Sequence, residues 1–402
     1  MDPITHGIAG ALIGKGFFSE REGRVATFAA ALGAVFPDID IVPVIFAEFF
    51  SDDRLATVKL HRGFTHSFFG LPLFAFLLAW LTRWYCSRRN WRAPSFWMLT
   101  LIYGVGIASH ILFDSATSYG TRIWNPLSTD RVAWDYVFII DFVFTAIVLL
   151  PQVAAWVFRD REKGAVRAGA MWLLFNVSAA GVWGISRWFG FPFHAWILLI
   201  IAAVLAGIFL LPLVRDRGFS ISRARWCRWG CYALVAYIAA CGVMHHLAMG
   251  RVREYAERNH LDANLLGAIP SPPSFLEWSG KIRTAGGVYQ ARFDLRDAAP
   301  SSFQFLADSP PDAFTAEAMK LPEVQVYLWF SRFYVMHSRA VGDLHVVEFG
   351  DSRFSEPGRM PAPFRFRLLF DASGKLIEED WAEGMPGFRK TKSRMPASEN
   401  RP

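Results

Sequence analysis

Two histidines, His61 and His66, lie in the segment HRGFTHSFFG, directly before an almost unbroken apolar run. Other apolar segments also carry ionisable side chains; these are His6, Asp38, Asp40, His110, Asp114, Asp135 and Asp141. Ionisable groups in or beside membrane segments are costly and usually mark function. Imidazole nitrogen and carboxylate oxygen are zinc ligands, and they also suit manganese or iron. The pattern therefore predicts a divalent metal site, with zinc as the first choice.

Spacing and chemistry suggest a role for each residue. His110 and Asp114 are four residues apart, so on a helix both side chains lie on one face. The predicted metal ligands are His6, Asp38, His61, His66, His110 and Asp114. Asp40 is the first choice for a bridging ligand or for a base on metal-bound water, and Asp135 is the second. Arg62 and Arg122 would hold an anionic group, because guanidinium suits phosphate.

Simpler interpretations of the same residues stay open. His6 could lie at the membrane interface, and PDID could be a helix-ending turn. Asp135 and Asp141 could be a helix cap and a buried hydrogen-bonding partner. The remaining histidines near these segments have no acidic neighbours and are expected to be structural; they are His194, His245 and His246.

The composition of the whole chain indicates a membrane protein. Of 402 residues, 53% are hydrophobic and 19% are charged, whereas soluble domains carry about 25% charge. The net charge of +7 comes from short basic clusters between apolar segments, which is typical of cytoplasmic loops rather than of nucleic-acid binding. The four cysteines indicate neither a disulfide framework nor a paired thiolate zinc site.

About eight apolar segments must position the polar residues. They cover roughly 4–18, 25–47, 67–82, 96–113, 133–158, 169–189, 193–213 and 230–249. Basic clusters at 83–92, 159–167 and 215–228 fall in every second connection, so we expect these connections to be cytoplasmic. The candidate ligands and everything after residue 250 then lie on the outer side.

The chain after residue 250 changes character. Strand-like runs are predicted at 287–295, 324–335, 344–350 and 364–381, the last with a turn at 371–374. The predicted fold class is an all-α polytopic membrane helix bundle followed by a small β-rich extracytoplasmic domain. The domains are 1–250, 251–387 and a disordered tail at 388–402.

Five motifs, in order and spacing, resemble the membrane-bound metal-dependent hydrolases of the YdjM-like family. They are THGIAGALIG, GAVFPDIDIV, HRGFTHSFFG, SHILFDSATSYGTRIWNPLS and RVAWDYVFIIDFVF, and the resemblance is strongest over residues 1–150. That family is distantly similar to zinc-dependent phospholipase C and P1-type nucleases, all-helical enzymes with a multinuclear zinc site. The resemblance places metal ligands on the six residues above. It leaves a third metal in doubt, because a later H-x-x-x-E helix is missing; Asp135 or Asp141 would fill part of that role.

The expected function is that of an integral membrane hydrolase in a bacterial inner membrane. A metal-activated water would cleave a phosphoester or lipid-linked substrate at the outer face. The expected partners are membrane lipid and an anionic or lipid-like substrate, with no nucleic acid. Two alternatives stay open: a non-catalytic envelope protein in which the metal staples helices, and a transporter with a His/Asp ion path. The sequence has no inverted repeat of the kind common in transporters.

Overall fold

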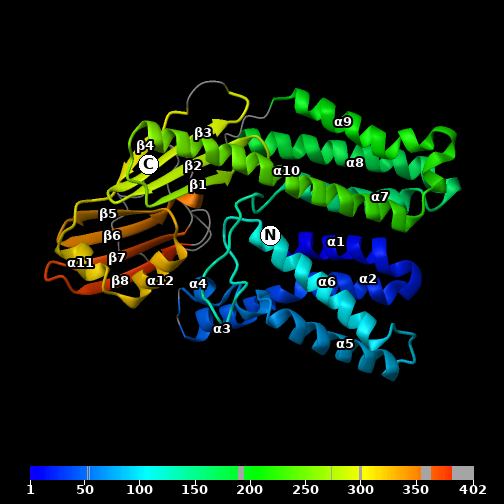
Figure 1. Ribbon diagram of the computed structural model, residues 1–402, viewed down its shortest axis with the longest axis horizontal. Coiled ribbons are helices and arrows are strands. Elements are labelled where there is room, and N and C mark those ends of the chain that lie inside the picture. The colour runs from blue at the N-terminus through cyan, green and yellow to red at the C-terminus, as the bar shows by residue number, and fades with distance from the viewer. Residues whose placement is uncertain are drawn as a thin grey trace.

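The computed structural model describes residues 1–51, 53, 55–188, 194–272, 274–297, 301–354 and 364–382. The predicted tail at 388–402 lies outside these residues. The described chain has a helical N-terminal region and two antiparallel β-sheets after it (Figure 1). The helices of the N-terminal region are α1 (Pro3–Ile13), η1 (Gly14–Phe18), α2 (Ser19–Val35), η2 (Phe36–Asp40), α3 (Ile41–Phe50), α4 (Ala56–Leu60), η3 (Phe64–His66), α5 (Gly70–Arg88), α6 (Phe96–Ser115), α7 (Phe142–Val157), α8 (Arg161–Trp188), α9 (Trp196–Phe209), η4 (Leu211–Ser220) and α10 (Arg223–Arg258).

Small residues let the first helices pack closely. The chain reverses at Gly23, whose φ of 77° is in the left-handed region that glycine adopts readily, and α2 then packs against α1. A Cβ atom on Gly10 of α1 would lie 2.5 Å from the carbonyl oxygen of Ala30. A Cβ atom on Gly106 of α6 would lie 2.6 Å from the same oxygen. Helices α1, α2 and α6 are therefore in backbone contact.

Five helices of the described chain are long and apolar enough to cross a membrane. Counting the pair Ala56–His66 and Gly70–Arg88, which is bent by 70°, raises the number to six. The eight expected segments therefore do not all form separate long helices. The first two fall in one continuous candidate, Pro3–Phe50. The fifth begins only at Phe142, because the Asp141 side chain caps α7 there and the residues from 133 to 141 are not helical.

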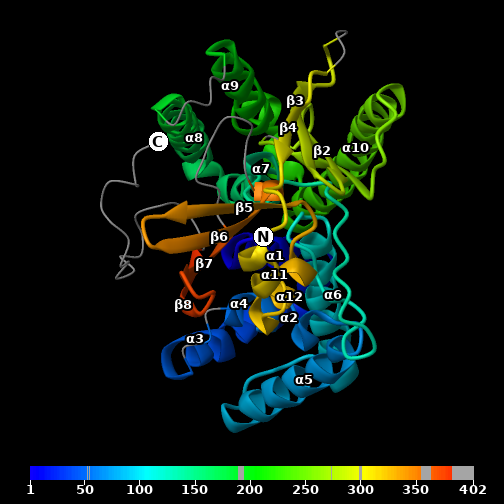
Figure 2. The ribbon, with the colours of Figure 1, turned by 90° about the vertical axis from the view of Figure 1, so that its left-hand side faces the viewer.

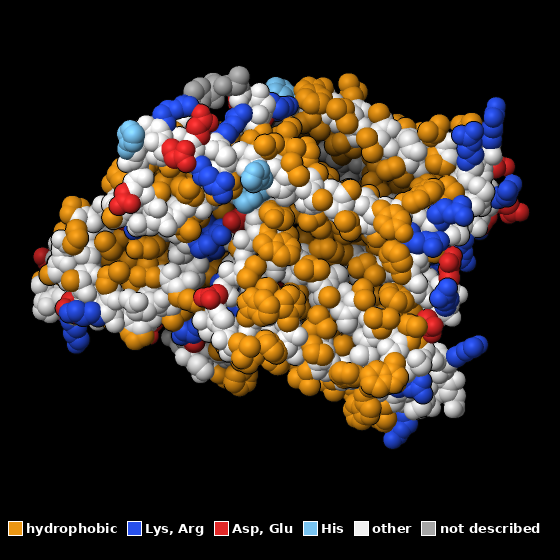
Figure 3. Space-filling model, viewed as in Figure 1, with side chains coloured by type: hydrophobic (Ala, Val, Ile, Leu, Met, Phe, Trp, Pro, Cys, Tyr) orange, Lys and Arg blue, Asp and Glu red, His pale blue; other side chains and the backbone are white. Residues whose placement is uncertain are grey.

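The predicted cytoplasmic connections gather at one end of the bundle. Arg161 forms an ion pair of 3.2 Å with Asp216, which joins the connection before α8 to η4. A Cβ atom on Gly16 of η1 would lie 3.3 Å from the backbone nitrogen of Arg228 in α10. Figure 3 shows hydrophobic side chains over the helices and many Lys and Arg side chains at the bundle end farthest from the sheets. This distribution agrees with the positive-inside expectation.

The C-terminal region contains two four-stranded antiparallel sheets. The first has β1 (Leu265–Pro270), β2 (Glu277–Thr284), β3 (Gly287–Asp294) and β4 (Gln304–Ala307), paired in that order. The second has β5 (Tyr334–Val341), β6 (Leu344–Asp351), β7 (Arg365–Asp371) and β8 (Leu376–Ala382), also in chain order. Two short helices, α11 (Ala313–Ala318) and α12 (Pro322–Phe330), lie between the sheets in sequence, and η5 (Ser352–Phe354) follows β6.

The strand predictions succeed in part. Three of the four predicted runs consist mostly of strand residues, and the predicted turn at 371–374 connects β7 to β8. The run at 324–335 was expected to be a strand, but its first part is α12. Pro322 stands in the first turn of this helix, where proline is tolerated. The side chains of Val324, Tyr327 and Phe330 are buried, and their spacing of three fits one face of a helix.

The sheets cover one end of the bundle, and α10 connects the two regions (Figure 1). The last turns of α10, with Ala248, Val252 and Ala256, pack against Trp278 and Ile282 of β2. Figure 2 looks onto that end and shows α11 and α12 in front of α1 and α2. The C-terminal region therefore lies over the end of the bundle at which α1 begins.

Candidate metal centre

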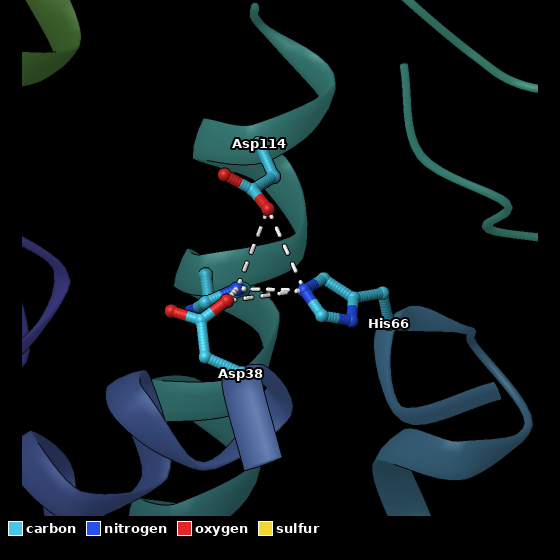
Figure 4. A group of neighbouring side chains, drawn as sticks. Asp38, His66 and Asp114 are labelled. Carbon is cyan, nitrogen blue, oxygen red and sulfur yellow. Dashed lines mark hydrogen bonds and ion pairs between the residues drawn. The ribbon is translucent and has the colours of Figure 1, made fainter. Parts of the chain in front are cut away.

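Four donor atoms from three segments meet beside the end of α6. They belong to Asp38, His66, His110 and Asp114 and lie within 4.8 Å of one another. The two imidazole Nε2 atoms are 3.0 Å apart. Asp38 Oδ1 lies 3.6 Å from His66 Nε2 and 3.5 Å from His110 Nε2. Asp114 Oδ2 lies 3.5 and 3.4 Å from the same two nitrogens. Figure 4 shows Asp38, His66 and Asp114 pointing toward one another.

Five of the six separations between the donors are close to the edges of a tetrahedral metal site. Zinc bonds of roughly 2.0–2.2 Å to nitrogen and oxygen imply ligand-to-ligand edges of roughly 3.3–3.6 Å. Five of the six edges between the four donors range from 3.0 to 3.6 Å. The donor set of two imidazoles and two carboxylates also suits manganese or iron. The residues present therefore fit a single divalent cation.

The other ring nitrogens hold both imidazoles in a metal-binding orientation. His110 Nδ1 lies 2.7 Å from the carbonyl oxygen of Ala34, which can only accept, so Nδ1 carries a proton. His66 Nδ1 lies 3.2 Å from Asp40 Oδ2. A neutral imidazole that donates from Nδ1 has a lone pair on Nε2. Metal-binding histidines are commonly fixed in this way by a carbonyl or a carboxylate.

Each donor is positioned by a short feature of the local sequence. Pro37 stands in the first turn of η2, the short helix that holds Asp38 directly after α2. His66 ends η3, just before α5. His110 and Asp114 are one turn apart in the last part of α6. The close contact of α2 with α6 then brings the Asp38 turn against the face that carries both.

Three of the four donor side chains are deeply buried, and the fourth is partly exposed. The side chains of His66, His110 and Asp114 are at most 1% exposed, whereas the side chain of Asp38 is 13% exposed. The second oxygen of Asp38 has no hydrogen-bond partner among the described residues. Asp38 is the most exposed of the four residues, although its second oxygen is itself buried.

Asp40 orients its neighbours instead of facing the four donors. Its Oδ1 atom lies 2.8 Å from His61 Nδ1. Its Oδ2 atom accepts from the backbone N–H of Arg62 at 2.8 Å and from the Thr65 hydroxyl at 3.1 Å, besides its contact with His66. The carboxylate is thus surrounded by donors, an arrangement that suits a positioning residue better than the expected bridging ligand or base.

His6 and His61, the other two predicted ligands, lie beside the four donors. His6 Nε2 is 3.1 Å from Asp114 Oδ1, the oxygen that does not face His66 and His110. The ring of His6 stacks on that of His110, with 3.7 Å between the ring centroids. The Met1 amino group is 2.5 Å from the same oxygen. His61 is half-buried, with its ring centroid 5.7 Å from that of His66. Contacts of this kind depend on tertiary packing, and the sequence spacing carries no sign of them.

Arg62 contacts the centre directly. Its Nε atom lies 2.9 Å from Asp114 Oδ2, and its Nη1 donates to the Thr117 hydroxyl at 3.1 Å. The Arg62 backbone has φ of 58°, in the left-handed region that few non-glycine residues adopt. The guanidinium therefore balances one buried carboxylate. Its expected role in holding a substrate anion stays a prediction.

Two further arginines hold the segment that carries His61 and Arg62. Arg122 donates to the carbonyl oxygens of Lys59 and Leu60 at 2.7 and 3.3 Å, so its donors face backbone rather than the four donors. Arg131, which the sequence did not single out, donates to the carbonyl oxygen of Val58 at 2.6 Å. Burial lowers the pKa of Arg131 to about 10 and also lowers the pKa of Arg122.

The C-terminal region contacts these arginines. The Arg131 guanidinium lies 4.9 Å from the ring centroid of Trp329 in α12. Asp135 pairs with Arg332 at 2.7 Å, so it joins the two regions. Asp141 caps α7 and accepts from the Tyr237 hydroxyl at 2.7 Å, which matches the simpler interpretation of this residue. No sequence pattern indicated the contacts of Asp135 and Arg131 with the C-terminal region.

One comparison with known proteins found a similarity, and it covers the N-terminal part of the chain. Residues 1–186 match the family model described as YdjM inner membrane protein. No curated protein and no solved structure matches the chain. Residues 1–186, which supply all four donors, are therefore similar to the YdjM inner membrane proteins.

Proposed function

We propose that this chain is a metal-dependent hydrolase of the inner membrane that cleaves a phosphoester or a related anionic, lipid-linked ester. The observation that carries the proposal is the set of four donors, three of them buried, whose spacing suits one divalent cation. Two imidazoles oriented by second hydrogen bonds are the arrangement expected for metal binding. A bound divalent cation would supply a Lewis acid and an activated water.

The residues around the donors suit the handling of an anionic group and a proton. A substrate would approach the donors beside Asp38, because Asp38 alone of the four is partly exposed. Asp40 holds His61 through Nδ1 at 2.8 Å, so the Nε2 atom of the half-buried His61 is available to accept or donate a proton. Arg62 contributes positive charge beside Asp114. In this proposal His61 replaces Asp40 as the proton-transfer group.

The proposed topology places the centre on the outer side. The basic connections gather at the bundle end away from the sheets, and the positive-inside rule assigns that end to the cytoplasm. The chain would then cross the membrane several times, and its C-terminal domain would be extracytoplasmic. The substrate would be attacked at the outer leaflet.

A second candidate function rests on a specific observation. Structural zinc sites use four protein ligands, whereas catalytic sites usually keep one position for water. Four protein donors are present here, so a metal that only holds helices together is the second candidate. The partial exposure of Asp38 favours the catalytic proposal, because this ligand can give way to substrate.

Purified full-length protein in detergent separates the two candidates. We expect about one equivalent of zinc, manganese or iron by elemental analysis, and hydrolysis of bis(4-nitrophenyl) phosphate that a chelator abolishes and added metal restores. Bound metal that raises the melting temperature without hydrolysis of phosphoester or lipid substrates would favour the staple. Protein that folds and binds no metal contradicts both.

A further inference from the structure

A groove open to the side of the bundle runs along α1 between α2, α7 and α8. Its volume is about 710 Å³, within the range of roughly 300–1,000 Å³ found for ligand sites. Its lining begins with Pro3 and Ile4 at one end and reaches Lys15 at the other. Between these ends the lining side chains are almost all apolar, with Phe28 and Trp156 on its two sides.

The length of the groove matches one hydrocarbon chain. Pro3 and Lys15 are twelve residues apart, which corresponds to roughly 18 Å along a helix at 1.5 Å per residue. One leaflet of a bilayer contributes about half of a hydrocarbon core that is about 30 Å thick. An extended lipid chain therefore fits between the two ends.

The two ends of the groove differ in chemistry. At the inner end, Lys15 donates to the Gln152 side-chain oxygen at 2.7 Å. The Gln152 amide nitrogen in turn donates to the carbonyl oxygens of Ile8 and Val148. The polar groups of Lys15 and Gln152 already have hydrogen-bond partners within the protein, and they close the inner end of the groove.

The other end lies beside the metal centre. Val35 lines the groove there, and Asp38, the partly exposed donor, follows it by three residues. Gly7 also lines this end, next to His6 in the chain. A chain that lies in the groove with its methyl end at Lys15 would therefore direct its polar head toward Asp38.

We propose that this groove binds the single hydrocarbon chain of a lipid substrate and presents its anionic head to the metal centre. The term substrate rests on the function proposed above, whereas binding of the chain does not require hydrolysis. The groove sets the substrate class: an anionic ester on a chain about as long as one leaflet is thick, with its head on the outer side.

The test uses hexadecyl phosphate that carries a photoreactive diazirine near its terminal methyl group. The probe is added to full-length protein in nanodiscs, and labelled peptides are mapped by mass spectrometry with unlabelled hexadecyl phosphate as competitor. We expect saturable labelling around Lys15, Gln152 and Trp156. Labelling that cannot be competed, or labelling concentrated at Pro3–Gly7, would overturn the proposal, because it indicates bulk lipid or a reversed chain.

A second experiment fills the groove with larger side chains. Ala31→Phe on α2 and Ala11→Phe on α1 add a ring to its walls, and each is expected to weaken saturable labelling about tenfold, the effect of excluding two methylene groups. Ala180→Phe, on an exposed position of α8, is the matched control and should leave labelling unchanged. Size-exclusion elution and a melting curve establish that each variant is folded. If both groove variants fold and label like the parent, the groove is not the binding site.

The failure of this inference and the failure of the proposed function are distinguishable. Competed labelling at the inner end without hydrolysis of any phosphoester supports binding of a lipid chain in the groove and contradicts the hydrolase proposal. Hydrolysis of bis(4-nitrophenyl) phosphate, which has no long chain, without competed labelling supports the hydrolase and removes the groove.

Discussion

The Nε2 atoms of His66 and His110 lie 3.0 Å apart, although the Nδ1 atom of each ring already faces an acceptor. Two neutral imidazoles in this state would direct lone pairs at each other, which is unfavourable in a buried site. Two carboxylate oxygens within 3.6 Å add negative charge to the same place. A divalent cation among the four atoms relieves all of these contacts together.

Removal of a donor from α6 should therefore remove the metal. We expect His110→Ala and Asp114→Ala to lose bound metal in elemental analysis, and any hydrolytic activity with it. His194→Ala is the control, because His194 is exposed and lies outside the donor set. Full metal content in both α6 variants would place the ion elsewhere.

Asp40 should affect the metal more weakly than Asp38. Asp40→Asn keeps the shape of the side chain but weakens its hold on the Nδ1 atoms of His61 and His66. Loss of such an orienting partner typically lowers metal affinity 10–100-fold. Competition with a fluorescent chelator would measure this, and Asp38→Asn should lower the affinity further. The reverse order of the two variants would make Asp40 the ligand.

The sequence could predict the donors that depend on local spacing. His110 and Asp114 are one helical turn apart in an apolar segment, and this spacing alone places both on one face. The sequence could not show which of His61 and His66 belongs to the four donors, because this depends on how Asp40 holds each ring. The contact between Arg131 and Trp329 joins residues almost two hundred positions apart and left no local pattern. The apolar residues of α12 are compatible with a strand or a helix. The buried residues Val324, Tyr327 and Phe330 are three apart, a spacing that fits one face of a helix.

The C-terminal domain should be dispensable for metal binding. All four donors come from residues 38–114, and the domain contacts the segments around them through Trp329, Arg332 and Arg353. We expect a chain that ends at residue 261 to keep most of its metal and to melt at a lower temperature. A folded truncation without any metal would show that the domain completes the centre.

Reporter fusions should reveal the orientation of the chain. Fusions at residues 87, 163 and 220 fall in or beside basic connections and should report a cytoplasmic location. A fusion at Gly342, in the turn between β5 and β6, should report an external location. A cytoplasmic signal at Gly342 would place the centre at the inner face of the membrane.

The contact between α2 and α6 should link helix packing to metal affinity. A Cβ atom on Gly106 would lie 2.6 Å from the carbonyl oxygen of Ala30, a backbone atom that cannot rotate away. Gly106→Ala must therefore push α6 from α2, and overpacking of this kind typically costs about 1–3 kcal/mol. The shift also moves His110 away from Ala34, so the melting temperature and the metal affinity should fall together. Gly181→Ala in α8 is the matched control, because no atom lies within 4 Å of its Cβ position. If Gly106→Ala lowers the melting temperature alone, the donors do not depend on how closely these two helices pack.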